Sequence, residues 1–253
     1  MIWRSCEDGT EYRDDVITVL TKHLQNLTAP IPPDRTPQAD ARPVLPPLTP
    51  ADDLAANTPG ASLRDKLDES GAGLVERVVS WLLRRPPEWD SWRKGLAGER
   101  RVGAELNRLG CHGWRVLHSI PLANKVDIDH LLIGPGGVFS INTKHHHKRV
   151  VWGGDDSVKV DHGKPAPYAR NSRAEAKRVV RVLERYCDFS VPVEPVLVFV
   201  GVTELKVVAT QLSVRVYQER QVSALAPLSG VLTADQVEQV YSVARHRQAW
   251  AQA

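Results

Sequence analysis

From Leu96 to Trp250 the sequence alternates between two hydrophobic periods, and this alternation limits the possible folds more than any other feature. Apolar residues recur every three or four positions at 96–109, from Ser172 onward and from Thr233 to about Trp250, which predicts helices. Alternating or short continuous apolar runs predict strands at about 114–120, 128–133, 138–144, 150–152, 158–160, 193–202, 206–209 and 214–217. This order predicts an α/β domain with a central mixed β-sheet flanked by helices.

The first part of the chain has a different pattern. Residues 12–27 have the apolar spacing of one short amphipathic helix, and 62–85 resume a helical pattern that Pro86 and Pro87 end. Between them, prolines crowd residues 30–59, where large apolar residues are few, so we expect an extended linker without core contacts at 30–60. The sequence thus predicts a short N-terminal helical segment at 1–29, a Pro-rich linker at 30–61, a helical connector at 62–91 and a compact domain at 92–253.

Several protein classes do not fit this sequence. No segment approaches the roughly 18 consecutive apolar residues of a membrane-spanning helix, and the N-terminus lacks the basic-then-apolar order of a secretory signal. Cys6, Cys111 and Cys187 are odd in number and widely spaced, which indicates neither a disulfide framework nor a cysteine zinc site. We therefore expect a reduced, cytoplasmic protein.

Charge is distributed unevenly along the chain. Residues 1–90 carry a formal charge of −5, whereas residues 91–253 carry +8 and eight of the nine histidines. The basic part is a candidate for contact with an anionic partner such as nucleic acid, although a soluble domain can carry this charge without one. The acidic N-terminal arm is a candidate for contact with a protein partner.

Three carboxylates stand where a carboxylate is costly. A helical wheel places Glu99 on the apolar face of its helix, where a carboxylate needs a metal or another cation as partner unless its head escapes at the helix end or pairs with a local arginine. Asp127 and Asp129 share one face of a strand and repel each other unless a cation lies between them, although aspartate before a strand is also a common turn residue. The three residues are candidate metal ligands.

Asn142 and Lys144 share one face of the strand at 138–144. The turn at 134–137 predicts a hairpin that brings Asp129 alongside them. A carboxylate, an amide oxygen and an ammonium group in one place could hold Mg²⁺ and activate a water against a phosphodiester. A lysine at a strand end is also common without any such role.

Three motifs in this order resemble the nuclease-related domain (NERD) of the PD-(D/E)XK, restriction-endonuclease-like superfamily. They are Gly98-Glu99 with Val102, the run Val126–Pro135, and the run Gly137–Lys144, and the resemblance covers roughly residues 93–205. It implies a restriction-endonuclease-like core and a phosphodiesterase site that uses Mg²⁺, with Mn²⁺ as a substitute. By position, Glu99 corresponds to the acid of the first helix, Asp129 to the main metal ligand and Lys144 to the catalytic lysine.

The sequence departs from the superfamily at position 142. A carboxylate is expected two residues before the lysine, and Asn142 stands there, so ion affinity should fall unless Asp127 or Glu99 compensates. Restoring a carboxylate at position 142 should therefore tighten ion binding.

Other residues are candidates for contact with nucleic acid. Arg173, Lys177 and Arg181 recur every four residues and could follow phosphates, or could form a solvated helix face. For His145 and His146 we favour phosphate contact or solvent exposure over metal binding, because successive strand residues alternate faces. Asn171 and Glu175 resemble a polar pair of the family, although Ser172 to Glu175 also has the form of a capping box, which gives Glu175 a structural role.

Three functional hypotheses follow. The first is a Mg²⁺-dependent nuclease that acts on DNA, or with less support on RNA. The second is a nucleic-acid-binding module that keeps the fold without cleavage, which Asn142 favours. The third is an accessory protein whose acidic N-terminal arm binds a partner.

Overall fold

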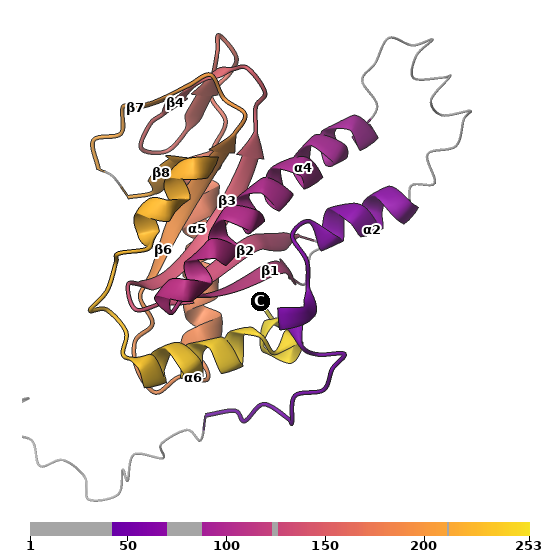
Figure 1. Cartoon of the computed structure of the whole chain (residues 1–253), viewed down its shortest axis with the longest axis vertical. Helices are drawn as coiled ribbons and strands as arrows, with labels where there is room; N and C mark the ends of the chain where they lie inside the picture. The colour runs from indigo at the N-terminus through magenta and orange to yellow at the C-terminus, as the bar shows by residue number, and fades with distance from the viewer. Residues whose placement is uncertain (1–41, 70–87, 123–125, 212) are drawn as a thin grey trace, which may run out of the picture. The chain divides into compact units, whose positions relative to one another are not determined.

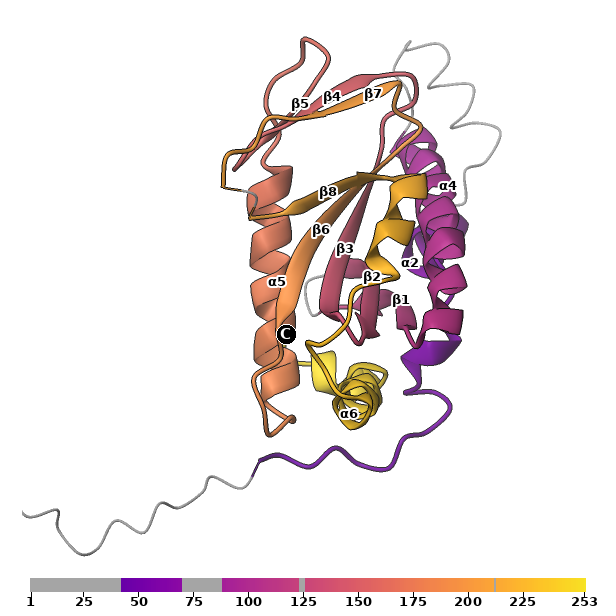
Figure 2. The same cartoon turned by 60° about the vertical axis from the view of Figure 1, so that its left-hand side comes forward.

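The structure is a computed structural model that describes residues 42–69, 88–122, 126–211 and 213–253. Its central element is a mixed sheet of five strands in the order β1-β2-β3-β6-β8 (Figures 1 and 2). The strands are β1 (Arg115–Pro121), β2 (Asp127–Gly134), β3 (Gly137–His145), β6 (Val193–Val200) and β8 (Arg215–Gln218). The first three strands are antiparallel, and β3, β6 and β8 are parallel. This is the expected mixed sheet.

A smaller sheet has the order β5-β4-β7 and consists of β4 (Val150–Gly153), β5 (Val158–Val160) and β7 (Glu204–Val207). The helices are α2 (Ala61–Glu69), α4 (Glu88–Asn107), α5 (Tyr168–Glu184) and α6 (Ala234–Ala244). Short 3-10 turns are η1 (Leu54–Ala56), η2 (Arg108–His112), η3 (Glu219–Leu225) and η4 (Arg247–Trp250). Figure 2 shows α4 and α5 on opposite faces of the large sheet, with α6 across one end.

Alternation along the strands builds a hydrophobic core on each face of the large sheet. Phe139 and Ile141 of β3 point to the α4 side and pack with Val102 and Leu106. The opposite face packs against the apolar sides of α5 and α6. Strand β6, which lies between β3 and β8, contributes to both faces, since Val196 and Val198 join the α4 side while Leu197 and Phe199 join a third cluster beside the small sheet. This double burial explains its continuous apolar run.

The predicted hairpin is confirmed. Strands β2 and β3 pair from Gly134–Gly137 to His130–Ile141. Gly137 has a φ of +111°, which a residue with a side chain rarely adopts, so the glycine is required at this turn. The hairpin places the start of β2 beside the end of β3, and both ends carry the polar residues that the sequence singles out.

Some predicted helix bounds are wrong. Helix α4 begins at Glu88 rather than Leu96, because its first residues lack the apolar period of the rest; the helix packs on α2 as well as on the sheet. Gly95 allows this approach, since a Cβ there would lie 3.0 Å from Leu63 Cδ1. Helix α5 begins at Tyr168 rather than Ser172, and α6 ends at Ala244, after which η4 follows.

The expectation that residues 30–60 make no core contact is wrong for the described part. Leu54 is fully buried, and its N–H donates to the carbonyl of Arg245. Asp53 accepts hydrogen bonds from the Arg245 guanidinium, and Arg247 N–H donates to the carbonyl of Asp52. One apolar residue and a set of backbone bonds therefore fix this segment despite its prolines.

The expectations for the N-terminal arm cannot be compared with the structure. The helix at 12–27 and the rest of the acidic arm to residue 41 lie outside the described residues, and the four regional boundaries stay predictions. None of the helices in the described ranges combines the length and the apolar composition that a membrane crossing requires.

Candidate active site

The candidate site lies where β2 and β3 separate. The regular pairing of these strands stops at His130–Ile141. Beyond this pair, Asp129 contacts β3 through its side chain instead of its backbone. Its Oδ2 accepts a hydrogen bond of 2.6 Å from the backbone N–H of Thr143. This bond fixes the Asp129 carboxylate at the end of the hairpin.

Glu99, Asp127 and Asp129 converge at this point. Each offers one carboxylate oxygen, and these oxygens lie within 4.8 Å of one another. Asp127 and Asp129 come together because they are two residues apart on β2 and so share a face. Glu99 approaches from α4, one turn before Val102, on the buried side of the helix that the wheel predicted.

Burial dominates the electrostatics of Glu99. The residue is 5% exposed. Burial raises its pKa to about 9, and the carboxylates of Asp129 and Asp127 act in the same direction. The backbone N–H of Gly60, at the start of α2, partly offsets this shift in pKa by hydrogen bonding to Glu99. Gly60 has a φ of +74°, and a Cβ there would lie 2.3 Å from Leu96 Cδ1, so glycine is needed for this approach.

Lys144 faces the same carboxylates. Burial raises the pKa of Asp129 to about 7, and the Lys144 ammonium group opposes this shift. Lys144 also acts on Glu99 and Glu175, so its charge lies among the acids. The prediction that Asp129 and Lys144 lie on neighbouring strands is confirmed, because β2 pairs with β3.

The residues present fit a divalent cation. Within the described part of the chain, Glu99 Oε2, Asp127 Oδ2 and Asn142 Oδ1 are buried and have no hydrogen-bond partner. Buried carboxylates without partners are costly, and an all-oxygen set suits Mg²⁺ or Mn²⁺ better than Zn²⁺. Two ligand oxygens on one Mg²⁺ are at most about 4.2 Å apart, so small side-chain adjustments would bring the cluster to that spacing.

The sequence between α4 and β6 decides the family. Residues 94–200 match the family model of the nuclease-related domain. This part of the chain is a nuclease-related domain. The family is placed in the PD-(D/E)XK superfamily, and the match indicates a nuclease-like function. No curated protein and no solved structure was found to match the chain.

Within this nuclease-related domain, Asn142 has an acidic neighbour that the sequence did not predict. Glu175 of α5 accepts hydrogen bonds from Ser140 Oγ at 2.7 Å and from Asn142 Nδ2 at 3.3 Å. Its carboxylate also acts electrostatically on Asp129. The negative charge that position 142 lacks is therefore present on the helix that packs against it.

The capping-box interpretation of Glu175 is wrong. Because α5 begins at Tyr168, Ser172 lies inside the helix, and its buried Oγ has no hydrogen-bond partner among the described residues. Glu175 is thereby turned towards β3 instead of towards the helix end. The signal that could have revealed this is the spacing of three and four residues between Ser172, Ala176, Val179 and Leu183, all of which are buried on the sheet side of α5.

The candidates for nucleic-acid contact in the nuclease-related domain lie in different environments. His145 and His146 are partly buried on opposite sides, His145 beside Gly98 of α4 and His146 stacked on Tyr168 of α5. Arg173 is held by Asp156, the carbonyl of Asp155 and Ser213, so it has a structural role. The remaining candidates on α5, which are exposed, are Asn171, Lys177 and Arg181.

Proposed function

We propose that this protein is a divalent-ion-dependent nuclease that hydrolyses phosphodiester bonds of DNA. The observation that supports it most is the convergence of Glu99, Asp127 and Asp129 beside Lys144 in a nuclease-related domain. Three acids next to one lysine, with Glu99 buried and Asp127 and Asp129 half-buried, serve no purpose in packing, since removing a carboxylate from water is costly. Together they fit one cation and one phosphate.

Each residue then has a defined task. Mg²⁺ or Mn²⁺ held by Asp129, Asp127 and Glu99, with Asn142 Oδ1 as a further oxygen, would supply positive charge against the negative charge that develops on the scissile phosphate. Lys144 Nζ donates hydrogen bonds to a phosphate oxygen or to the attacking water, which it orients and stabilises. The Thr143 N–H keeps the Asp129 carboxylate in place.

The test is cleavage of supercoiled and linear DNA by the full chain with increasing Mg²⁺ or Mn²⁺. We expect cleavage that EDTA abolishes, and a loss of at least about 100-fold in Asp129→Asn and Lys144→Ala, as for other groups that stabilise transition-state charge. Asp188→Asn, which changes an exposed aspartate in the loop between α5 and β6, is the control and should cleave as the wild type does. Cleavage that needs no ion, or that survives Asp129→Asn, would contradict the proposal.

A nucleic-acid-binding module without cleavage is the second candidate, and Asn142 favours it. In that case the wild type binds DNA with an affinity that falls steeply with salt, because phosphate contacts release counterions. It cleaves neither DNA nor RNA at any ion concentration. The two functions therefore differ in cleavage and share binding.

A further inference from the structure

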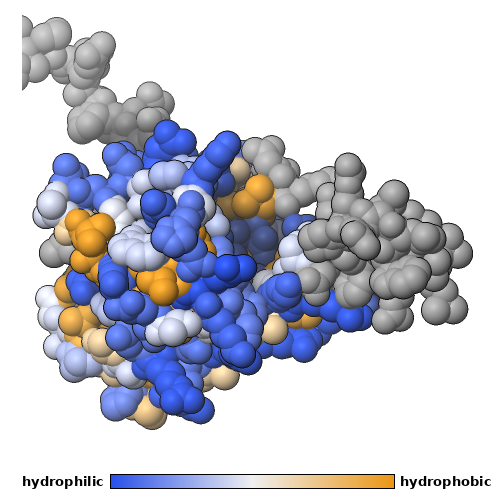
Figure 3. Space-filling model, turned by 90° about the horizontal axis from the view of Figure 1, so that it is seen from above, coloured by the Kyte–Doolittle hydropathy of each residue, from blue (hydrophilic) through white to orange (hydrophobic). Residues whose placement is uncertain are grey.

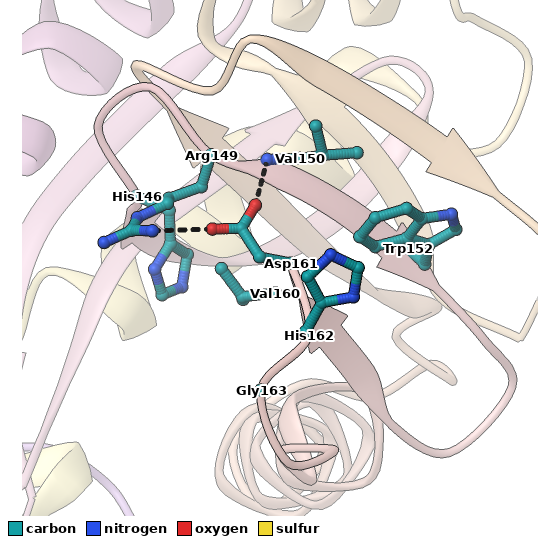
Figure 4. Close-up of a pocket in the computed structure, with 8 residues that line it drawn as sticks. All are labelled: His146, Arg149, Val150, Trp152, Val160, Asp161, His162 and Gly163. Atoms are coloured by element: carbon teal, nitrogen blue, oxygen red, sulfur yellow. Dashed lines mark hydrogen bonds and ion pairs between the residues drawn. The ribbon is translucent and has the colours of Figure 1, made fainter.

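A cavity of about 640 Å³ lies beside the small sheet, where its lining residues come from β4, β5 and the turns that flank them (Figure 4). We call it the Trp152 pocket and define it by His146, Arg149, Trp152, Asp161 and His162. Figure 4 shows Arg149 and His146 at one end of the pocket and Trp152 with His162 at the other. The volume is in the range of pockets that bind small organic molecules.

Asp161 fixes the basic end of the pocket. Its carboxylate accepts a hydrogen bond of 2.8 Å from the Arg149 guanidinium and another of 2.8 Å from the Val150 N–H (Figure 4). Asp161 has a φ of +47° and Lys148 one of +55°, both in the left-handed region that costs energy for residues with a side chain. The strained turns hold Arg149 at the rim with its side chain 61% exposed.

Trp152 forms the centre of a basic row across the small sheet. It is paired with Lys159 of β5 on one side and Lys206 of β7 on the other, so the three side chains share one face. Lys206 Nζ lies 5.8 Å from the centre of the indole ring. An aromatic ring between lysines is the arrangement that single-strand-binding proteins use to stack bases and contact phosphates. Figure 3 shows this end of the molecule as largely hydrophilic, with separate hydrophobic patches.

Aromatic contacts connect the pocket to the acidic cluster. Lys144 Nζ lies 5.4 Å from the centre of the Tyr168 ring, and Tyr168 stacks on His146 at a centroid distance of 6.0 Å. His146 is a lining residue of the pocket, and its Nε2 is buried without a partner among the residues described. Tyr168 therefore links Lys144, which lies among the acids, to His146 at the edge of the Trp152 pocket.

We propose that the Trp152 pocket binds one unpaired nucleotide of a single-stranded DNA substrate, with a phosphate at Arg149 and the base against Trp152. The proposal rests on the nuclease function proposed above, because it places the pocket on the path of the cleaved strand. Arg149 pairs with Asp161 at the surface, where an ion pair contributes little, so it can contact a phosphate as well. A base that is paired and stacked in a duplex is not free to enter a side pocket, which makes the unpaired strand the preferred ligand.

The experiment measures equilibrium binding of the full chain by fluorescence anisotropy in EDTA, so that no ion-dependent cleavage occurs. The probes are a labelled oligothymidylate of about 12 nucleotides, a length typical of single-strand sites, and a duplex of the same length. Trp152→Ala should weaken binding of the single strand about tenfold, whereas Trp152→Phe, which keeps a flat ring, should retain most of it. Binding of the duplex should change less than twofold in both variants.

Arg149→Ala tests the phosphate end. It should reduce the slope of log K against log salt concentration by about 0.7, as expected for one lost contact to a single strand. Arg115→Ala is the matched control, because Arg115 is also an exposed arginine in an ion pair, with Glu238, and lies away from the pocket on β1. We expect no change of slope in the control.

Three outcomes would overturn the proposal: no binding of the single strand by the wild type, an unchanged affinity in Trp152→Ala, or equal weakening for the duplex. A melting curve of Trp152→Ala like that of the wild type excludes loss of folding as the cause of weaker binding. If Trp152→Ala melts at a lower temperature, the comparison of Trp152→Phe with the wild type still tests whether a flat ring at position 152 is sufficient for binding. The nuclease function and the pocket proposal can be tested independently of each other. Binding that depends on Trp152 but yields no cleavage with Mg²⁺ or Mn²⁺ contradicts the nuclease function alone, and cleavage that is unaffected by Trp152→Ala contradicts the pocket alone.

Discussion

Asn142 and Glu175 show how one charge can be kept while its position changes. The side chain at position 142 is neutral, yet its amide group donates to a carboxylate that reaches the same place from α5. Burial raises the pKa of Glu175, while hydrogen bonds from Ser140 and Asn142 and the charge of Lys144 favour its ionised form. A divalent cation in the cluster would add to these favourable interactions, so we expect Glu175 to contribute to ion binding without belonging to the convergent set of oxygens.

Exchange of the two groups provides a direct test. Glu175→Gln should weaken Mn²⁺ or Mg²⁺ binding about tenfold, which corresponds to about 1.4 kcal/mol, because it removes a buried charge near the ion. Asn142→Asp in the Glu175→Gln background should recover most of the affinity, since the carboxylate returns to position 142. Calorimetric titration of the wild type and the two variants measures this. Ion affinity that is the same with and without the Glu175 carboxylate would show that position 175 is too far from the ion to matter.

At the residue scale, local patterns predicted most of the site. Glu99 was identifiable because helical period alone places it on a buried face, and Asp127 with Asp129 because strand alternation pairs them. Glu175 was noticed through its resemblance to a polar pair of the family, but a capping-box pattern assigned it a structural role, so its contacts with Ser140 and Asn142 of β3 were not predicted. Trp152 was missed, since its significance depends on Lys159 and Lys206, which come next to it only through strand pairing.

At the scale of elements, the segment around η1 is a structural part of the domain. Leu54 enters the core beside α6 and η4, where Trp250 is also buried. Its neighbours bond to the turn between those two elements through Asp53 and Arg245. The segment therefore covers apolar surface that would otherwise face water.

Truncation of Leu54 should consequently cost stability. Leu54→Ala is expected to lower the free energy of unfolding by about 2–5 kcal/mol, the range for a buried leucine that leaves a cavity. Leu48→Ala is the matched control in the same proline-dense segment, since Leu48 is 40% exposed, and it should change the value by less than about 0.5 kcal/mol. Urea denaturation followed by circular dichroism measures both. Equal effects of the two substitutions would mean that the segment is not packed in solution.

Strands were easier to predict than helix ends. The predicted bounds of β1 to β6 agree with the structure to within about two residues, because a period of two fixes which residues face the core. The start of α4 was misplaced because its first residues lack an apolar stripe, and the start of α5 was misplaced because Ser172 to Glu175 has the form of a capping box although the helix begins at Tyr168. The docking of residues 49–60 was not predictable from proline content, because one leucine and a few backbone bonds decide it.

At the scale of the whole molecule, a buried histidine pair links stability to pH. His118 Nδ1 lies 2.8 Å from His130 Nδ1, and His118 Nε2 lies 3.2 Å from Asn107 Oδ1. The amide oxygen only accepts, so His118 donates through Nε2 and accepts at Nδ1. Protonation of His118 would place two donors against each other. Burial lowers the pKa of His118 to about 4.

The sign of the effect follows from this shift. Unfolding returns the His118 pKa to about 6.5, so the unfolded chain binds more protons as the pH falls, and the stability contributed by neutral His118 is complete above pH 6.5 and lost below it. At pH 5.5 this single group should lower the free energy of unfolding by roughly 1 kcal/mol relative to pH 7.5. The glutamine of His118→Gln does not titrate. The decrease in the free energy of unfolding between pH 7.5 and pH 5.5 should therefore be roughly 1 kcal/mol smaller in this variant than in the wild type. Parallel curves for both proteins, measured by urea denaturation, would contradict this assignment.

The junction between residues 52–54 and 245–247 joins parts of the chain that are almost 200 residues apart in sequence. During synthesis, residues 52–54 leave the ribosome long before their partners exist, and the site for Leu54 is complete only after α6 and η4 have followed. Contacts between such distant residues form late, because a long loop must first close. We therefore expect the nascent chain to expose Leu54 until α6 and η4 have emerged. The Gly60 N–H that supports Glu99 belongs to the same late-docking segment, so we expect the acidic cluster to take its final form only after those two elements have been made.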